Sequence, residues 1–507
     1  MREDYEKKIH SLEERLQQVE SRTNAVAPST NFTAAATNAV PPMSERARAF
    51  MRLQFNQETE TRDWALAREQ SGPVRERLQQ VLNDFIDITG YFRAGYGRDD
   101  EGGPQPAFQA PGAFAKYRLG NEAENYGELA FGKNWYVPDL FSLDSNVRPD
   151  GTPSGPIART QVRLAFYDPY SSLGSAGGFQ TSLPEAWASI GNVVASQPTL
   201  KFWAGSRFYR RQDIYINDFF FQNMSGNGGG FEDLQLPFGK LALAWIGSGA
   251  QAGIYASDIA IAPEPNNQAG FSKQSVDLTL YEVPVPWGKA EFNLVWSGET
   301  GGLNSAGQEA PDSQGGALSI LHTHEHFLSD DGVNRFSVQV GRGAAKTFTT
   351  GFETTVATTN GTFIIPDARD SLRVRLTESF IAQPCENFSF SPALVYQYTT
   401  HDPQAALNWF SAGIRPIYHF NRYFSLAFET GADYVVDSTT AGLTGTLWKV
   451  SLAPQVSLGG GFLSRPVIRA YVTYAGWSDT LKGAVGGNDF ANRNNGVVWG
   501  MQMESWW

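Results

Sequence analysis

Three histidines alternate along one short stretch of the sequence, at His322, His324 and His326. Side chains two positions apart in an extended strand point to the same side, so the three imidazoles would share one face. A face of that kind can hold zinc or copper. The alternative is that they are polar wall residues close to a turn expected at residues 330–332. The spacing alone leaves both interpretations open.

Two acidic residues, Asp213 and Asp218, are the other candidates for chemistry. A pair of carboxylates can cleave a glycosidic bond, with one acting as the acid and the other as the nucleophile or base. The same residues can also be charged positions on a wall, paired with basic residues nearby. The sequence contains no Gly-x-Ser-x-Gly elbow, no His-Glu-x-x-His pair and no phosphate-binding glycine loop. A hydrolase is therefore the weaker interpretation.

Composition narrows the class of protein further. The 507 residues carry a formal net charge of -12, from 40 basic and 52 acidic side chains, and include one cysteine. These values exclude a basic nucleic-acid binder and a disulfide-stapled scaffold. Apolar runs such as residues 241–246 are far shorter than the roughly 18 to 20 residues of a membrane-spanning helix. What remains is either several soluble β domains or one large membrane barrel, because strand alternation hides the apolar signal of a barrel.

The N-terminal region differs from the rest of the chain. Residues 1–22 carry a heptad spacing of apolar side chains, at Tyr5, Ile9, Leu12, Leu16 and Val19. They predict a short coiled-coil helix or, alternatively, a lone amphipathic surface helix. Residues 23–43 are uncharged and rich in Ala, Thr, Asn and Pro, which predicts a flexible linker. Helical composition over residues 44–84 predicts a second helical segment before a barrel at 85–507.

No secretory signal is visible at the N-terminus. Charged residues follow Met1 directly, and no apolar core of about 7 to 15 residues comes after them. Taken alone, this favours the cytoplasm. For an exported protein, we expect that the signal was removed or that the sequence is incomplete.

After residue 85 the period of the apolar pattern changes from 3.6 to 2. In the last strand, Trp499, Met501 and Met503 share one face, whereas Gln502 and Glu504 share the other. A soluble sandwich would show the same alternation, but girdle aromatics and an aromatic last residue favour a membrane barrel. At roughly 22 to 25 residues per strand and connection, the 423 residues from 85 to 507 predict an all-β barrel of 18 antiparallel strands.

A barrel of this size encloses a water-filled channel, so function is expected on the lumen wall. Segments rich in Gly, Asn, Asp and Pro predict long surface loops. These segments are residues 99–106, 148–156, 225–230, 298–316 and 483–496.

Several strings of the barrel region resemble the maltoporin family of outer-membrane sugar channels. They are Gly90 to Gly95, Lys116 to Glu122 continuing to Tyr126 and Glu128, Trp203 to Gly205 with Arg207 to Tyr209, Gly413 to Pro416, Ser464 to Pro466, and Gln502 to Trp507. They occur in the same order from near residue 85 to the last residue. The N-terminal coiled coil instead looks like the periplasmic extension of sucrose porins.

The resemblance implies a homotrimer of 18-stranded barrels in a bacterial outer membrane, each narrowed by an inward-folded third loop. Oligosaccharides would pass by facilitated diffusion along a row of aromatic side chains flanked by ionic residues. A pyranose has an apolar C–H face that a flat ring can hold and a rim of hydroxyls that charged groups can bond. Such a channel breaks no bond and needs no cofactor.

Carried over position by position, the resemblance implies two sets of substrate-binding residues. The aromatic slide consists of Tyr91, Tyr126 and Trp506. The ionic track consists of Arg93, Arg118, Glu128, Arg211, Asp213 and Asp218. Beside the track, Phe220 replaces the tyrosine that narrows the constriction in the family, which keeps the steric block and loses a hydroxyl. As part of a track with three arginines, Asp213 and Asp218 are better explained as wall residues than as a glycosidase pair.

Other positions depart from the family pattern. A track arginine aligns near Pro184, and the aromatic residues of the exit end align near Val333 and Leu463, with Phe462 adjacent to the latter. The loop tryptophan that reaches a neighbouring subunit has no clear match, and Tyr170 or Phe179 are the nearest candidates.

Cysteine usage also departs from the family. The two cysteines that staple the first loop of the family are both alanine here, Ala107 and Ala123. Cys385 is expected to be a buried or lipid-facing residue of a strand rather than a reactive thiol.

Two other functions remain open from the sequence. One is a general diffusion porin with little sugar selectivity. The other is a structural outer-membrane protein tethered to the envelope through its coiled coil. Maltodextrin, sucrose and β-glucosides would all stack on the same rings, so the sequence does not name the sugar.

Overall fold

The structure is a computed structural model, and it describes most of the predicted barrel. The described residues are 86–122, 124–136, 155–168, 180–249, 272–303, 309–352, 355–357, 362–364, 368–402, 405–438 and 442–507. The coiled-coil helix predicted for residues 1–22, the linker at 23–43 and the helical segment at 44–84 lie outside these residues. Tyr170, Phe179 and Ala123 also lie outside them.

Eighteen antiparallel strands form one sheet. The strands are β1 (Asp87–Asp99), β2 (Asn125–Tyr136), β3 (Ile157–Asp168), β4 (Gln180–Gly191), β5 (Lys201–Arg207), β8 (Gly226–Leu236), β9 (Gly239–Gly249), β10 (Ser272–Val285), β11 (Gly288–Thr300), β14 (Ser313–Glu325), β15 (Val333–Arg342), β18 (Leu372–Cys385), β19 (Phe388–Asp402), β20 (Ala405–His419), β21 (Phe424–Asp437), β22 (Gly445–Ser457), β23 (Val467–Trp477) and β24 (Asn495–Trp506). Two small hairpins, β12 (Gly302–Leu303) with β13 (Glu309–Ala310) and β16 (Thr355–Ala357) with β17 (Thr362–Ile364), lie in connections.

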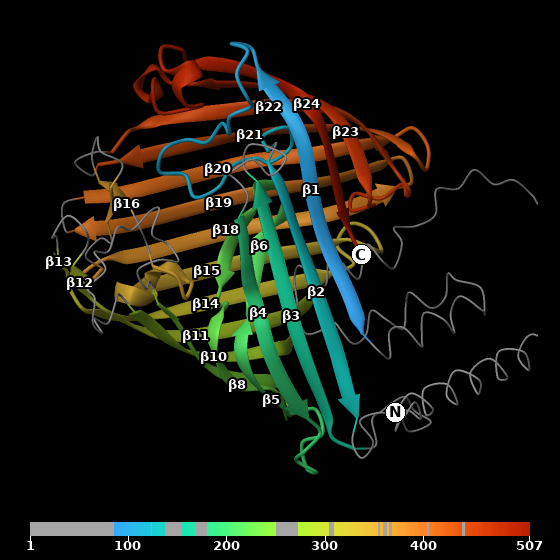
Figure 1. Ribbon diagram of the computed structural model, residues 1–507, viewed down its shortest axis with the longest axis vertical. Helices are drawn as coiled ribbons and strands as arrows, with labels where there is room; N and C mark the ends of the chain where they lie inside the picture. Colours follow the sequence, from blue (N-terminus) through green and yellow to red (C-terminus); the bar gives the residue numbers. More distant parts are fainter. Residues whose placement is uncertain are drawn as a thin grey trace, which may run out of the picture. The chain divides into compact units, whose positions relative to one another are not determined.

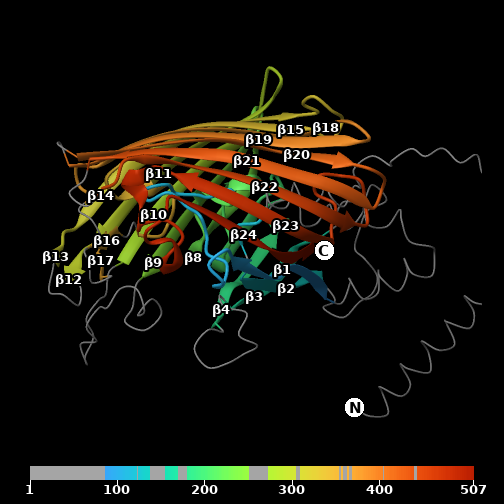
Figure 2. The same ribbon diagram turned by 90° about the horizontal axis from the view of Figure 1, so that it is seen from above.

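The sheet closes on itself between its first and last strands. β1 pairs with β2 on one side and with β24 on the other, so that Tyr91 is the register partner of both Glu128 and Trp506. Figure 1 shows β1 in blue beside β2 and β24, and Figure 2 shows the strands from above. The predicted 18-stranded barrel is confirmed. Among the described residues, no helix is long and apolar enough to cross a bilayer.

The two faces of the sheet differ in the way that the alternation predicts. On β24, Met501 is 61% exposed on the outside, whereas Gln502 and Glu504 are 4% and 1% exposed on the inside. The same division recurs around the barrel, with apolar residues such as Trp245 and Leu294 outside and charged residues inside. An apolar outer face around a polar interior belongs to a membrane barrel rather than to a soluble sandwich.

Most connections at the end of the barrel that holds Asp87 and Trp506 are shorter than those at the opposite end, although residues 137–156 join β2 to β3 at this end and residues 403–404 join β19 to β20 at the other. Two-residue turns at 237–238, 286–287 and 386–387 join strands at the end that holds Asp87 and Trp506. The loops predicted near residues 99–106 and 483–496 are confirmed at the opposite end, and the one predicted for 298–316 is limited to 301–312 because strands occupy its flanks.

The loop predicted for residues 225–230 is wrong, because this stretch begins β8. A Cβ at Gly228 would lie 2.0 Å from the carbonyl oxygen of Trp245 on β9, and one at Gly230 would lie 2.2 Å from that of Leu243. These glycines therefore permit two strands to approach closely, which is the usual meaning of glycine inside a strand.

The main hydrophobic cluster lies inside the barrel, where two inward-folded loops pack against the strands. The first loop (residues 100–124) contributes Phe108 and Tyr117, and the third loop (208–225) contributes Ile216 and Phe221, all at most 2% exposed. Figure 1 shows the first loop in blue, lying against β20 to β22. Because these loops fill much of the interior, the open path is confined to what they leave free.

A buried ion-pair group holds the first loop in place. Glu429 of β21 accepts a hydrogen bond from the backbone N–H of Leu119 at 2.9 Å, and Lys449 of β22 donates to the Leu119 carbonyl oxygen at 2.5 Å. Glu429 also pairs with Lys449 at 2.8 Å and with Arg415 at 2.5 Å. Ala107, at one of the two positions where the family has a cysteine, is exposed. In this chain, side chains of the barrel wall hold the loop without a disulfide.

The three histidines do not share a strand face. His322 and His324 lie on β14 with Leu318 and Ile320, which are exposed on the outside of the barrel, and their rings are 6.4 Å apart. His326 follows the end of the strand with a φ of 60° and contacts the carbonyl oxygen of Asp330. Within the described part of the chain, no group of three or more His, Cys, Asp or Glu side chains is arranged to hold a metal ion.

The lone cysteine lies at the last position of β18. Cys385 is exposed there, beside the short turn at residues 386–387. The strand placement is confirmed, and the expectation that it could be buried is wrong.

Candidate functional site

The third loop crosses the barrel interior. It forms β6 (Arg211–Ile214), a 3-10 turn η3 (Tyr215–Asn217) and β7 (Phe219–Asn223). Asp218 links the turn to β7 in a left-handed conformation, with a φ of 52°, which aspartate adopts more readily than most residues. Arg335 of β15 donates to the side chain of Gln212 at 2.8 Å, and Arg375 of β18 donates to the carbonyl oxygen of Phe221 at 2.6 Å. These bonds fix the loop against the wall opposite its own strands, as an inward-folded third loop requires.

The three residues of the predicted aromatic slide lie together. The rings of Tyr91 and Trp506 are 6.3 Å apart and nearly parallel, at 15°, and those of Tyr91 and Tyr126 are 6.0 Å apart. This grouping follows from strand register, because Tyr91 pairs with Trp506 on β24 and Arg93 pairs with Tyr126 on β2. Each aromatic residue also has a charged residue two positions away on the same strand face, as alternation predicts.

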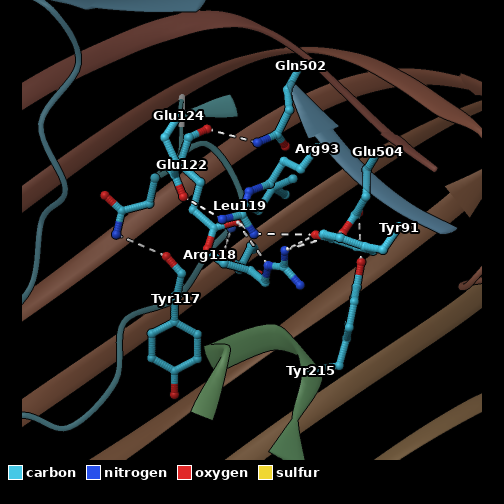
Figure 3. Close-up of polar contacts among 12 residues, drawn as sticks. Tyr91, Arg93, Tyr117, Arg118, Leu119, Glu122, Glu124, Tyr215, Gln502 and Glu504 are labelled. Atoms are coloured by element: carbon cyan, nitrogen blue, oxygen red, sulfur yellow. Dashed lines mark hydrogen bonds and ion pairs between the residues drawn. The ribbon is translucent and has the colours of Figure 1, made fainter. Parts of the chain in front are cut away.

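Glu504 takes part in many of the polar contacts beside these rings, and Figure 3 shows it next to Tyr91 and Tyr215. Tyr91 donates to its Oε1 at 3.1 Å and Tyr215 of the third loop donates to its Oε2 at 3.0 Å. Three arginines pair with the same carboxylate: Arg118 at 3.3 Å, Arg465 at 2.8 Å and Arg469 at 3.0 Å. The carboxylate thus ties the first loop, the third loop and the barrel wall together.

Arg93 and Arg118 share the carboxylate of Glu122 in the first loop. Each guanidinium lies 3.1 Å from Glu122 Oε2, and Arg93 also pairs with Glu124. Burial opposes the charge of Glu122, but the two arginines outweigh it and lower its pKa to about 2. Both arginines donate to the Tyr91 hydroxyl as well, Arg118 at 3.0 Å and Arg93 at 3.3 Å. The Tyr91 ring is therefore held at a fixed angle.

A second charged group continues from Tyr126 along the wall. Tyr126 donates to Glu128, and Glu128 pairs with Arg163 of β3 at 3.0 Å. Arg163 also pairs with Glu185 of β4 at 2.5 Å and lies 5.2 Å from the centre of the Phe208 ring. This group connects the slide to the base of the third loop.

Arg211 lies between two phenyl rings. Its guanidinium carbon is 4.0 Å from the centre of the Phe208 ring and 4.3 Å from that of Phe220. Its charge also acts on Tyr126, which places it near the slide. With its faces against the rings, the guanidinium can direct its N–H groups to a ligand.

The two acidic residues of the third loop have different surroundings. Asp213 is 3% exposed, whereas Asp218 is exposed. Burial raises the pKa of Asp213 to about 6, although Arg335 and Arg211 act against that shift. Asp218 lies close enough to Arg118 for their charges to interact. Both therefore lie among the charged groups that surround the third loop.

Accessibility separates the predicted residues into two sets. Tyr91, Tyr126, Glu128, Arg211 and Phe220 are half-buried. Arg93, Arg118 and Trp506 are buried, with Trp506 only 8% exposed. The half-buried residues and the exposed Asp218 therefore present side-chain surface, whereas the buried set, which includes Asp213, does not.

The positions that depart from the family pattern are not open aromatic surfaces. Val333 packs against the main hydrophobic cluster, and Leu463 is 1% exposed. Phe462 is buried with its ring edge-on to Tyr215 at 6.1 Å. Pro184 lies on β4, where its carbonyl oxygen accepts a hydrogen bond from Ser206.

Several residues of the site were not predicted from the sequence, among them Glu122, Glu185, Tyr215 and Arg469, as well as Arg163, Phe208 and Arg465. Arg163 could have been found from its alternation with Arg159 and Gln161 on the inner face of β3. Phe208 and Arg465 lie in strings that resemble the family, but the resemblance gave them no role. Their contacts come from loops and turns, whose course strand periodicity does not predict.

Residues 86–507 match the LamB porin family. Among solved structures, the chain is similar to OccAB1 of Acinetobacter baumannii, with 10% identity and a TM-score of 0.44 over 83% of this chain and 96% of that one. It is also similar to OccD3 (OpdP) of Pseudomonas aeruginosa, with 11% identity and a TM-score of 0.40 over 83% and 91%. It is also similar to Salmonella typhi OmpF in a complex with daunomycin, with 8% identity and a TM-score of 0.41 over 84% of this chain and 99% of that one.

The family match covers the whole barrel and confirms the resemblance to maltoporins that the sequence strings carry. The closed 18-stranded sheet, its apolar outer face and its inward third loop are those of an outer-membrane channel protein. The chain belongs to the LamB porin family, whose members form porins of the bacterial outer membrane.

Proposed function

We propose that this porin is sugar-selective and mediates the passive, facilitated diffusion of maltodextrin-type or related oligosaccharides. The observation that carries the proposal is that the half-buried Tyr91 and Tyr126 have charged partners at their hydroxyls, Arg118 and Glu128 respectively. The rings can hold the apolar face of a pyranose, and Glu128 and Arg211 can exchange hydrogen bonds with its hydroxyl rim.

Weak contacts repeated along the wall suit transport better than one strong site. A channel must bind a solute well enough to admit it and weakly enough to release it. Successive contacts of this kind are offered by wall residues and by Arg211 of the third loop. The wall residues are Tyr91, Tyr126, Glu128 and Arg163. No bond of the sugar is broken, and no cofactor takes part.

The assembly is proposed with the function. We infer a homotrimer, as the family resemblance implies, with the segments at residues 1–22, 23–43 and 44–84 on the periplasmic side. The end of the barrel that holds Asp87 also holds the short turns, which face the periplasm in barrels of this type.

A general diffusion porin is the second candidate. It is favoured by the burial of Trp506 and by the lack of exposed aromatic side chains at Val333 and Leu463. In that case the rings would be remnants of a slide, and permeation would depend on solute size alone.

Swelling of proteoliposomes separates the two candidates. The rates for maltose, maltotriose, sucrose and cellobiose are compared with those for polyethylene glycols of matched hydrodynamic radius. A sugar-selective channel should admit at least one sugar class several-fold faster than the matched polymer. Equal rates at every size would instead support the general porin.

A further inference from the structure

Arg465 covers the ring of Trp506. Its guanidinium carbon lies 3.9 Å from the ring centre, in the geometry of a cation–π contact. Arg465 belongs to the connection between β22 and β23, residues 458–466, at the end of the barrel that holds Trp506. One face of the indole is thus covered by a side chain of the protein itself.

The same guanidinium also contacts the tip of the third loop. It donates to the hydroxyl of Tyr215 and pairs with Glu504 at 2.8 Å. The Tyr215 ring stands edge-on to Trp506, with the ring centres 6.3 Å apart. Arg465 therefore joins the wall, the indole and the loop tip at one point.

Because of this contact, Trp506, the third aromatic residue of the slide, is covered by Arg465. The Arg465 side chain is 5% exposed and Trp506 is 8% exposed, whereas Tyr91 next to them is half-buried. A sugar stacked on Tyr91 can reach Trp506 only if Arg465 leaves the indole.

The surroundings allow Arg465 to leave without stranding a buried charge. Glu504 keeps Arg118 and Arg469 as partners, at 3.3 and 3.0 Å, together with the Tyr91 hydroxyl. Removing the last partner of a buried carboxylate is costly, but removing one of three cations is much less so. Arg465 also lies in a connection rather than within a strand, so no ladder hydrogen bond needs to break.

We propose that Arg465 determines sugar specificity: its guanidinium covers the Trp506 ring until a saccharide displaces it. This inference rests on the proposed sugar-channel function. Only a saccharide with an unsubstituted pyranose face can replace the guanidinium on the indole, and its hydroxyl rim can then bond the displaced Arg465. Arg465 therefore selects among saccharides at Trp506, the last aromatic position of the slide after Tyr126 and Tyr91.

The test is sugar block of single-channel current in planar bilayers, with maltotriose as the probe. Arg465→Ala should lower the half-saturation concentration about tenfold, equivalent to ~1.4 kcal/mol, because the sugar no longer competes with a cation. Arg465→Lys, which keeps the charge and loses the flat guanidinium, should give an intermediate value. Arg422→Gln is the matched control, since Arg422 lies in another connection at the same end of the barrel and contacts the Tyr423 ring rather than Trp506. It should leave the value within about twofold.

A double-mutant cycle shows whether the gain in sugar affinity in Arg465→Ala depends on the Trp506 indole. In a Trp506→Ala background, Arg465→Ala should give no gain. The inference is overturned if wild type shows saturable block that neither Arg465 variant changes, or if the gain persists without Trp506. If no saccharide blocks either wild type or the Arg465 variants, the proposed function itself fails.

Discussion

Tyr91 and Trp506 face each other across the line where the barrel closes, as register partners on β1 and β24 with nearly parallel rings 6.3 Å apart. The contact joins the first strand of the barrel to the last, more than 400 residues along the chain. Closure of the barrel therefore brings Trp506 beside Tyr91, the two rings of the predicted slide that lie on its first and last strands.

The Tyr91 ring is the accessible member of that pair, and its removal should weaken sugar binding. Tyr91→Ala is expected to raise the half-saturation concentration for sugar block about fivefold, since one stacking contact is worth on the order of 1 kcal/mol. Open-channel ion conductance should stay close to that of wild type. Tyr91→Phe keeps the ring and loses the hydroxyl, so a loss as large as that of Tyr91→Ala would contradict the stacking role.

Phe208 should act by holding Arg211. Phe208→Ala removes one of the two rings beside the guanidinium, so its side chain becomes freer and its bonds to a sugar weaker. We expect a roughly three- to tenfold rise in half-saturation concentration, with Phe208→Tyr close to wild type. If Phe208→Ala still weakens sugar binding in an Arg211→Met background, where there is no guanidinium to hold, then Phe208 does not act through Arg211.

Ion selectivity should change with pH through Asp213. Burial raises the pKa of this carboxyl to about 6, so it is mostly neutral below that pH and negative above it. The reversal potential in a salt gradient should therefore shift toward greater cation selectivity between pH 5 and pH 7.5. Asp213→Asn should abolish that shift and resemble the low-pH wild type throughout. A shift of undiminished size in the variant would assign it to other groups.

The buried Glu429 should be needed to hold the first loop. Glu429→Gln leaves Arg415 and Lys449 without their shared carboxylate, and loss of a buried partner costs about 3–5 kcal/mol. We expect a lower unfolding temperature in a heat-dependent gel-mobility assay, together with larger current noise as the loop is released. Ser451→Ala is the milder control, because it removes one hydrogen bond to Leu119 and no charge. Equal behaviour of the two variants would exclude the ion-pair group as the anchor.

Strand periodicity predicted the barrel well because the two faces of each strand meet different solvents. The alternation of Met501 and Met503 with Gln502 and Glu504 is imposed by lipid outside and polar contacts inside, so it can be read directly from the sequence. Glycine composition was misleading at residues 225–230, where it reflects close packing of β8 against β9 rather than a loop. Composition does not distinguish these two uses of glycine.

The site was only partly predictable for a different reason. Tyr91, Tyr126 and Trp506 lie on neighbouring strands, so matching their sequence strings to a family also places them in space. Arg465 and Phe208 lie in a connection and at the start of the inward loop, where position depends on contacts with Trp506 and Arg211. No local sequence pattern predicts those contacts. The position of the Arg465 guanidinium over the Trp506 ring is therefore found only in the three-dimensional structure.

The most direct test of the central claim is single-channel current through wild type and Tyr91→Ala during titration with a series of linear oligosaccharides. A sugar-selective channel predicts saturable block of the wild type by at least one oligosaccharide class, with the half-saturation concentration rising in the variant while the open-channel conductance stays nearly unchanged. Steady current that is indifferent to every sugar in the wild type would contradict the account and leave a barrel that works as a general porin.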